Sequence, residues 1–389
     1  MNMRIRLQDV ARKAEVSMQT VSRVIRTPHL VAPETATRVR QVMEELGYVK
    51  NEQATALRLG RARTIGLLMP LLARPFWSEF VAGAEIYAHE RGYSSLLCDT
   101  SDSTLEEEYI ALLLGYQVAG IIYAPPHDHS KTHPACVMLT QSGTPTVVIS
   151  VYRDDLPYDH VRTDDRRAGY VIARHLLDLG HRRIAVVTDI YGPSYERLQG
   201  TYDALQEAEI SEETPCIFLA PDTYEGGFAA GQKILESGEP LPEAIFATTD
   251  MMTLGLLEAL RSHGIRIPED IAIASHDGLH ASAFVTPPLT TVAPRARDMG
   301  KTSVDRLLQS YVEQQPPSVH MVEADLLVRA STIGTEQMQT FSTPISDPIA
   351  WSRWRTQTVP IQRKRAEVAR LTFGQVLHNR KEAEALVEI

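Results

Sequence analysis

The sequence lacks several features that would place it in a specialised class of protein. Its 389 residues include only 3 cysteines, Cys98, Cys136 and Cys216. They are too widely spaced for a metal-binding or redox motif, so we expect reduced thiols in a cytoplasmic protein. No run of about 18 apolar residues is present, so no membrane-spanning helix is predicted. Met1 to Val10 is charged and lacks the apolar stretch of a secretory signal.

Sequence motifs of catalysis are also missing. The chain has no Gly-x-Ser-x-Gly nucleophile elbow, no P-loop and no Gly-x-Gly-x-x-Gly after a predicted strand. His127, Asp128, His129 and His133 have the composition of metal ligands but not the spacing of a tetrahedral site, and we interpret them as a solvated loop. We therefore predict no enzyme activity, no cofactor and no metal.

Positive charge is scarce overall but concentrated at one end. The formal net charge is −10. Residues 1–63 have 12 Lys and Arg against 6 Asp and Glu, a net +6, and the rest has 27 against 43, a net −16. A basic segment on an acidic body is typical of a DNA-binding module joined to a larger domain. A chance cluster of solvated charges is the alternative.

Three short helices are predicted in the first fifty residues. Leu7 to Ala14 has apolar residues at helical spacing, and Ser17 is a candidate N-cap for the second helix. Pro33 fits the first turn of the third helix, which Gly47 ends. Only residues 15 and 16 separate the first two helices, and this spacing suits a helix-turn-helix.

The second helix of such a unit enters the major groove with its N-terminal side chains against base edges. Met18, Gln19 and Arg23 are among its outward residues. Glutamine can pair with adenine, and arginine with guanine, through two hydrogen bonds each. Thr20 and Ser22 suit phosphate oxygens, which position the protein without specifying sequence.

This segment resembles the head of the lactose-repressor (LacI) family of transcriptional regulators. The matching pieces are Leu7 to Ala11, Val16 to Val24, Leu46-Gly47-Tyr48 and Asn51. The resemblance implies a homodimer on pseudo-palindromic operator DNA, with Met18, Gln19 and Arg23 reading bases. The predicted DNA-contacting residues of the head are Ser17, Met18, Gln19, Thr20, Ser22 and Arg23.

Two residues of the head depart from the family pattern. Glu15 stands where the family usually has glycine in the turn. If this position needs a positive φ, the side chain costs about 1 kcal/mol. Met18 stands where the lactose repressor has tyrosine, which leaves the operator sequence open.

Residues 51–61 form the predicted hinge. Taken alone, this segment is too short to hold a helix in water. Asn51, Ala54 and Leu57 match the hinge-helix pattern of the family. The resemblance implies that the helix orders on DNA beside its dimer mate, with Leu57 inserted into a minor-groove base step that it kinks.

Short apolar runs alternate with amphipathic helices from residue 62 to 334. This pattern favours parallel sheets covered on both faces, and the number of units favours two doubly wound lobes. The predicted strands are Thr64–Met69, Ser95–Cys98, Gly120–Ala124, Thr146–Val151, Ile184–Thr188, Ile217–Leu219, Ala244–Thr248 and Ile271–Ala274. The predicted helices include Phe76–Arg91, Arg166–Leu179, Arg197–Glu207 and Met251–His263.

Polar and aromatic residues follow these runs, where the ligands of such folds bind. They include Arg74, Trp77, Asp99 to Asp102, and Asp277. Aromatic faces, carboxylates and an arginine together suit a sugar.

The resemblance continues through the body, for example in Pro75 to Glu79, Glu196 to Gly200 and Thr286 to Val292. It implies a two-lobed, periplasmic-binding-protein-like domain for a small-molecule effector, most simply a carbohydrate. The predicted effector-binding residues are Phe76, Asp164, Arg197, Tyr224, Asp250 and Asp277. The family's pairs at Thr163-Asp164 and Thr249-Asp250 are altered here, which leaves the effector's identity open.

Simpler interpretations stay open for some of these residues. Asp250 fits the N-cap of the following helix, and Phe76 fits core packing. Residues 335–389 extend past the family's fold, and their basic, aromatic start around Trp351 and Trp354 suits either contact with DNA or a partner, or an extension without fixed order.

The sequence is compatible with two functions. The first is a homodimeric repressor whose DNA affinity depends on an effector held between the lobes. The second is a cytoplasmic sugar-binding module or sugar-processing enzyme with an incidental head.

Overall fold

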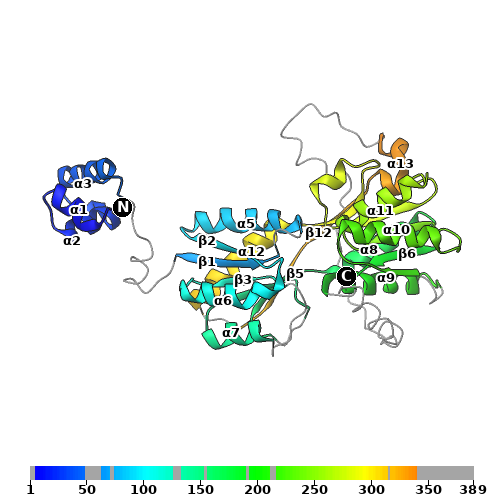
Figure 1. Cartoon of the computed structure of the whole chain (residues 1–389), viewed down its shortest axis with the longest axis horizontal. Helices are drawn as coiled ribbons and strands as arrows, with labels where there is room; N and C mark the ends of the chain where they lie inside the picture. Colours follow the sequence, from blue (N-terminus) through cyan, green and yellow to red (C-terminus); the bar gives the residue numbers. More distant parts are fainter. Residues whose placement is uncertain are drawn as a thin grey trace. The chain divides into compact units, whose positions relative to one another are not determined.

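The computed structural model describes residues 5–48, 63–70, 74–125, 133–152, 156–189, 192–210, 216–313 and 316–339. The chain divides into two compact units, Met1–Arg63 and Thr64–Ile389, called here the head and the body (Figure 1). The hinge residues Asn51, Ala54 and Leu57 and the tail from residue 340 lie outside the described residues. Within the described ranges, no helix is long and apolar enough to cross a membrane.

The head consists of α1 (Leu7–Lys13), α2 (Met18–Arg26), the short 3₁₀ helix η1 (Pro28–Leu30) and α3 (Pro33–Leu46). The Ser17 hydroxyl accepts a hydrogen bond from the Thr20 amide at 3.0 Å, so the predicted N-cap is confirmed. Pro33 occupies the first turn of α3, and Gly47 ends it at φ 63°. Only η1 is absent from the prediction.

The three helices of the head enclose a small apolar core. Val10, Val21 and Val39, one from each helix, are fully buried. Glu15, in the turn between α1 and α2, has a φ of 53°. The position therefore does require a positive φ. Glu15 holds a left-handed backbone conformation that glycine would adopt at a lower free-energy cost.

The body contains two six-stranded sheets, each the centre of one lobe. In the first, the strand order is β11-β5-β4-β3-β1-β2, and in the second it is β12-β10-β9-β8-β6-β7. The first-lobe strands are β1 (Thr64–Met69), β2 (Ser94–Asp99), β3 (Ile121–Tyr123), β4 (Thr146–Ile149), β5 (Asp159–Thr163) and β11 (Val319–Val322). The second-lobe strands are β6 (Ile184–Thr188), β7 (Cys216–Leu219), β8 (Ala244–Ala247), β9 (Ala272–His276), β10 (Thr290–Pro294) and β12 (Ala324–Leu327).

Both sheets are parallel except for the pairing of β12 with β10. The chain passes to the second lobe after β5, returns after β10, and crosses again between β11 and β12. The two lobes and their parallel sheets are as predicted.

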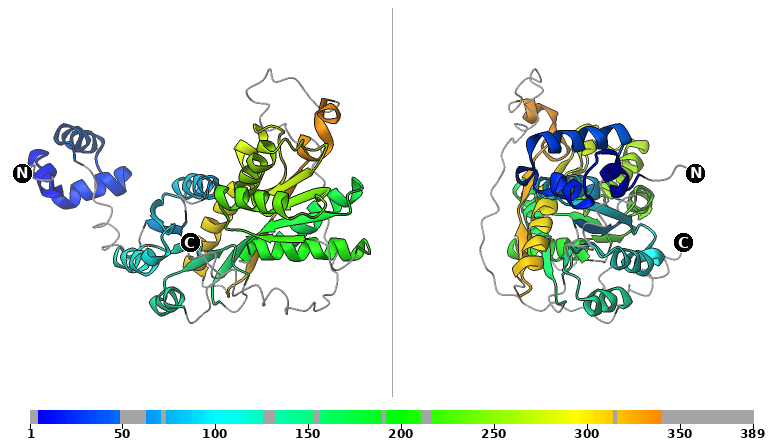
Figure 2. Two further views of the ribbon diagram at one scale, coloured as in Figure 1. Left: turned by 45° about the vertical axis from the view of Figure 1, so that its right-hand side comes forward. Right: turned by 90° about the vertical axis from the view of Figure 1, so that its left-hand side faces the viewer.

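Helices cover both faces of each sheet (Figure 2). In the second lobe, Val186 packs toward α8 (Asp165–Asp178) and α9 (Gly192–Glu207), and its neighbour Val187 packs toward α10 (Tyr224–Glu236) and α11 (Asp250–Ser262). Alternate side chains of a strand point to opposite faces, so a continuous apolar run serves both. The remaining elements are α5 (Phe76–Glu90), η2 (Ser103–Leu105), α6 (Glu106–Gly115), α7 (Pro134–Ser142), η3 (His280–Ala283), α12 (Ala296–Glu313) and α13 (Ala330–Gln339).

Strands β5, β10, β11 and β12 were not predicted from apolar runs. In β5, Asp159 and His160 are buried despite their polarity. The Asp159 carboxylate accepts hydrogen bonds from the hydroxyls of Ser310 and Ser318, at 2.6 and 2.8 Å. Partners distant in sequence thus allow polar residues in a central strand.

Candidate functional site

Helix α2 turns one face to the core of the head and the other to solvent. Val21 and Val24 are buried. Met18 is 55% exposed, and Gln19 and Arg23 are also exposed. The predicted base-reading residues therefore lie on the free face, which is the geometry that a recognition helix needs.

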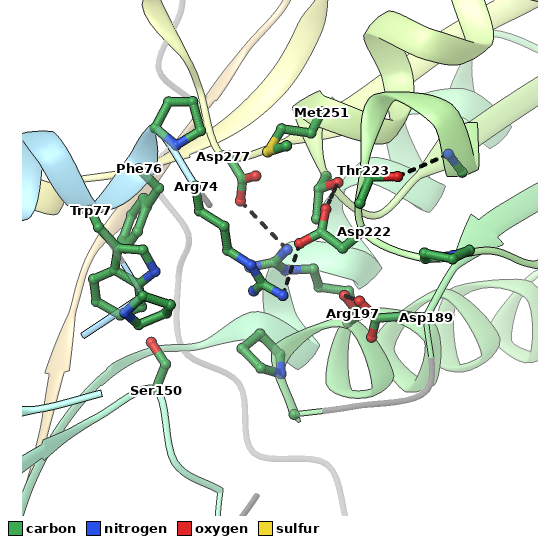
Figure 3. Close-up of a pocket in the computed structure, with 18 of the residues that line it drawn as sticks. Arg74, Phe76, Trp77, Ser150, Asp189, Arg197, Asp222, Thr223, Met251 and Asp277 are labelled. Atoms are coloured by element: carbon green, nitrogen blue, oxygen red, sulfur yellow. Dashed lines mark hydrogen bonds and ion pairs between the residues drawn. The ribbon is translucent and has the colours of Figure 1, made fainter. Parts of the chain in front are cut away.

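The body holds a cavity of about 850 Å³ between its two lobes (Figure 3). The first lobe contributes Arg74, Phe76, Trp77, Thr100, Ser150 and Thr163 to its wall. The second lobe contributes Asp189, Arg197, Asp222, Thr223, Met251 and Asp277. The cavity combines aromatic faces with convergent polar groups, as small polar ligands require.

Arg197 is the best-anchored polar residue of the wall. Its Nε donates to Asp165 Oδ1 at 2.7 Å, and its Nη1 donates to the Thr248 carbonyl oxygen at 2.6 Å. Arg197 Nη1 also lies 3.6 Å from Asp277 Oδ1. Three groups, at the start of α8 and just after β8 and β9, thus fix the guanidinium.

Asp165 is itself held by several groups. Thr163 donates its hydroxyl to Asp165 Oδ2 at 2.7 Å, and Tyr152 donates its phenol to the same oxygen. Burial opposes ionisation, but Arg197 and these donors still lower the pKa of Asp165 below its usual value. The carboxylate stays charged and can serve as the counter-ion of Arg197.

A glycine allows the helices that carry this pair to approach closely. A Cβ atom at Gly169, on α8, would lie 1.9 Å from the Arg197 carbonyl oxygen on α9. Any side chain at this position would push α9 away, which would separate Arg197 from Asp165.

Asp277 faces the cavity beside Arg197 and His276. Burial raises the pKa of Asp277 to about 7, although Arg197 and Arg74 lower it. Burial and the nearby Arg197 hold the pKa of His276 well below its usual value, so this imidazole is neutral. Asp277 also has a φ of 112°, and Ser150, across the cavity, has a φ of 55°. Non-glycine residues in such conformations cluster at functional sites.

The structure brings together only some of the predicted effector-binding residues. Phe76, Arg197 and Asp277 line the cavity, and Asp164 and Tyr224 are not among its described lining residues. Asp164 is exposed and caps α8, where its carboxylate accepts from the Arg167 amide at 2.9 Å. Tyr224 begins α10 and is 42% exposed.

Asp250 lies behind the cavity wall and is fully buried. Its carboxylate accepts from the Leu279 amide at 2.6 Å and from the Ser282 hydroxyl at 2.7 Å. The Ser275 and Thr291 hydroxyls donate to its other oxygen. The N-cap interpretation is wrong, because Thr249 caps α11 and Asp250 braces the loop after β9.

Sequence reasoning missed Asp189, Ser150 and Asp222. Asp189 follows β6, and Asp222 lies three residues beyond the end of β7. A search of the residues just after every predicted strand could have found both. No sequence signal distinguishes Asp165 from its neighbour Asp164. Among the described residues, no group of three or more His, Cys, Asp or Glu side chains could hold a metal ion.

An exposed recognition helix on a small helical head and a cavity between two parallel-sheet lobes define a class of protein. It is that of regulators that bind both DNA and a small molecule. Residues 6–51 match the family model for bacterial regulatory proteins of the lacI family, and residues 173–332 match the periplasmic binding protein-like domain.

Relatives cover most of the chain. The HTH-type transcriptional repressor PurR of Aliivibrio salmonicida is 32% identical over 78% of this chain and 91% of its own length. The HTH-type transcriptional regulator DegA of Bacillus subtilis is 34% identical over 77% of this chain and 89% of its own. The chain belongs to the lacI family of bacterial regulatory proteins, and it is a DNA-binding transcriptional regulator.

Solved structures agree with this assignment. The lac repressor dimer bound to operator and the anti-inducer ONPF matches with a TM-score of 0.77 and 28% identity, over 85% of this chain and 99% of that chain. The complex of the transcriptional regulator CelR with cellobiose matches with a TM-score of 0.65 and 30% identity, over 84% of this chain and 100% of that one.

Proposed function

We propose that this protein is a homodimeric, non-enzymatic repressor whose affinity for a pseudo-palindromic operator is controlled by a carbohydrate held between the lobes of its body. The observation that carries the proposal is the presence, on one chain, of an exposed recognition helix and a polar, aromatic cavity. Since operator DNA lies in the bacterial cytoplasm, the protein acts there.

In this proposal Met18, Gln19 and Arg23 contact base edges, and Ser17, Thr20 and Ser22 face phosphates. The exposure of α2 supports the first set. The Ser17 and Thr20 hydroxyls lie 2.9 Å apart at the start of the helix, where backbone amides and hydroxyls can meet a phosphate together. Asn51, Ala54 and Leu57 form the hinge, with Leu57 in the minor groove.

Phe76, Arg197 and Asp277 contact the effector. An aromatic face can stack on a sugar ring, and charged groups can form strong hydrogen bonds with hydroxyls. Solved relatives include complexes with cellobiose and with ribose. The effector controls DNA binding only to the extent that it binds the two lobe arrangements with different affinity.

Exposed apolar side chains on the body support a dimer. Ile86 on α5 is 55% exposed, and Leu97 on the edge strand β2 is 39% exposed. Phe284, in the second lobe, is 60% exposed. Large apolar side chains left in solvent on both lobes fit a self-complementary surface, and the lac repressor structure is a dimer.

Selection of bound DNA from a random pool with the full-length protein tests the first half of this proposal. We expect enrichment of a pseudo-palindrome. Binding of the enriched sequence, measured with and without cellobiose and ribose, tests the second half. Enrichment of no sequence would contradict a repressor, and an operator affinity that no sugar in a broad panel changes would contradict carbohydrate control.

A further inference from the structure

An ion pair joins the two lobes inside the cavity. Arg74 follows β1 of the first lobe, and Asp222 follows β7 of the second. Arg74 Nη2 lies 3.2 Å from Asp222 Oδ2, and Figure 3 shows the arginine extended toward this carboxylate. The Asp222 side chain is 7% exposed and that of Arg74 is 44% exposed. The anion is therefore held in one wall, and the cation reaches it from the other lobe.

The second oxygen of Asp222 is also occupied. Thr249 donates its hydroxyl to Asp222 Oδ1 at 2.6 Å. The same hydroxyl accepts from the Met252 amide at the start of α11. Asp222 is thus fixed to the second lobe, and its charge is directed at Arg74.

Arg197, the second arginine among the described lining residues, also has carboxylate partners. Arg197 pairs with Asp165 at 2.7 Å and with Asp277 at 3.6 Å. Neither Arg74 nor Arg197 lacks a carboxylate partner. The wall also includes Asp189, and the exposed Lys233 and Glu225 offset each other in charge.

The two sets of ion pairs should make the cavity bind anionic ligands less tightly than neutral ones. An anionic ligand that approaches either arginine lies beside the carboxylate already paired with it, where like charges repel. A neutral polyol meets no such repulsion, because its hydroxyls can donate to carboxylates and accept from guanidinium N–H groups. The charge of the ligand is therefore a basis for selection.

We propose that the Arg74–Asp222 pair restricts this cavity to electrically neutral, polyhydroxylated effectors and excludes uronic acids and sugar phosphates. The inference rests on the proposed function, whose carbohydrate class it narrows. Arg74 and Asp222 act as specificity-determining residues, and the pair places the charge selection at the contact between the lobes.

Calorimetric titration of the full-length protein with D-glucose, cellobiose, D-glucuronate and glucose 6-phosphate tests the proposal. Asp222→Asn is the informative variant, because the amide oxygen can still accept from Thr249 while Arg74 loses its counter-ion. We expect wild type to prefer the neutral sugars. We expect the variant to bind glucuronate about tenfold or more tightly than wild type does, which is the size of one charge-assisted hydrogen bond.

Two further variants complete the design. Arg74→Gln leaves Asp222 without its counter-ion and should raise the affinity for D-glucosamine about tenfold. It gives an independent result should Asp222→Asn fail to fold. Asp270→Asn breaks the exposed Arg266–Asp270 pair and should leave the affinities for all of these ligands unchanged.

The proposal is overturned if wild type binds glucuronate or glucose 6-phosphate more tightly than glucose, or if neither cavity variant gains affinity for its charged sugar. A different result would contradict the proposed carbohydrate control, namely that neutral sugars neither bind nor change operator affinity. The gain of glucuronate binding in Asp222→Asn would still be measurable in that case, so the two failures can be told apart.

Discussion

The recognition helix of the head and the cavity of the body present their functional groups in opposite ways. On α2, Met18, Gln19 and Arg23 are exposed. In the body, Arg197 and Asp165 are almost fully buried and bonded to each other. We therefore expect a substitution on α2 to affect DNA binding alone, and a substitution of Arg197 or Asp165 to leave a buried protein group without its partner. Substitutions in the two regions should therefore differ in the size and kind of their effects.

The largest effect is expected for Arg197→Met. The change leaves Asp165 buried without its cation, so the free energy of unfolding should fall by about 3–5 kcal/mol. Urea denaturation of the body measures this loss. Arg266→Met is the matched control, because its pair with Asp270 is exposed and should contribute less than about 1 kcal/mol. Equal losses of unfolding free energy in the two variants would contradict a larger contribution of the buried cavity pair than of the exposed surface pair.

A smaller effect, confined to DNA binding, is expected on α2. Gln19→Ala and Arg23→Ala should each weaken binding to the selected operator by about 1–3 kcal/mol, because each removes a proposed base contact. The control Arg40→Ala removes an exposed arginine from α3 and should change affinity less. Fluorescence anisotropy at fixed salt gives the affinities. A change in the urea midpoint of the body in either α2 variant would contradict the independence of the two regions.

The cavity should also make stability depend on pH. Burial raises the pKa of Asp277 to about 7, above the value near 3.9 of an unfolded aspartate. The folded state therefore binds the proton more tightly, and the free energy of unfolding contributed by Asp277 falls as pH rises through about 7.

Between about pH 6 and about pH 8, wild type should lose roughly 1 kcal/mol more than Asp277→Asn. Urea denaturation of both proteins at each pH isolates the contribution of Asp277 from that of every other titratable group. Asp270→Asn should behave as wild type, because Arg266 holds the pKa of Asp270 at about 2. Parallel pH profiles for wild type and Asp277→Asn would show that Asp277 is ionised throughout.

The smallest effect is expected in the turn before α2. Glu15→Gly should stabilise the head by roughly 0.5–1 kcal/mol, because glycine adopts the φ of 53° at lower cost. Gly47→Ala is the reciprocal change, at φ 63° and with open space around a new Cβ, and should destabilise the head by about 1 kcal/mol. Amide hydrogen exchange in α1 to α3 measures both. A loss of protection in Glu15→Gly would show that the glutamate has a stabilising role in the turn.

Most of the fold could be predicted from local patterns. The two-lobed body was predicted because buried parallel strands appear as continuous apolar runs between amphipathic helices. Strand β5 could not be predicted from an apolar run, since Asp159 and His160 are polar, and the Asp159 carboxylate is satisfied by serine hydroxyls distant in sequence.

The two candidate sites also differ in how far local sequence patterns predicted them. The exposed face of α2 follows from helical periodicity and the Ser17 cap, which involve residues three or four apart. Phe76, Arg197 and Asp277 were placed on the cavity through resemblance to a family. The roles of Asp164 and Asp165 could not be separated, because one faces solvent and the other faces Arg197.

The sequence by itself determined the helices of the head, their caps, the recognition face and the alternation that builds two sheets, because these depend on interactions within a few residues. Apart from Asp277, only the tertiary structure decided which carboxylates lie at or behind the cavity wall. Asp165 holds Arg197, Asp250 braces a loop behind the wall, and Asp222 meets Arg74 from the opposite lobe. Those roles depend on strand ends from both lobes meeting in space, and no local pattern contains that information.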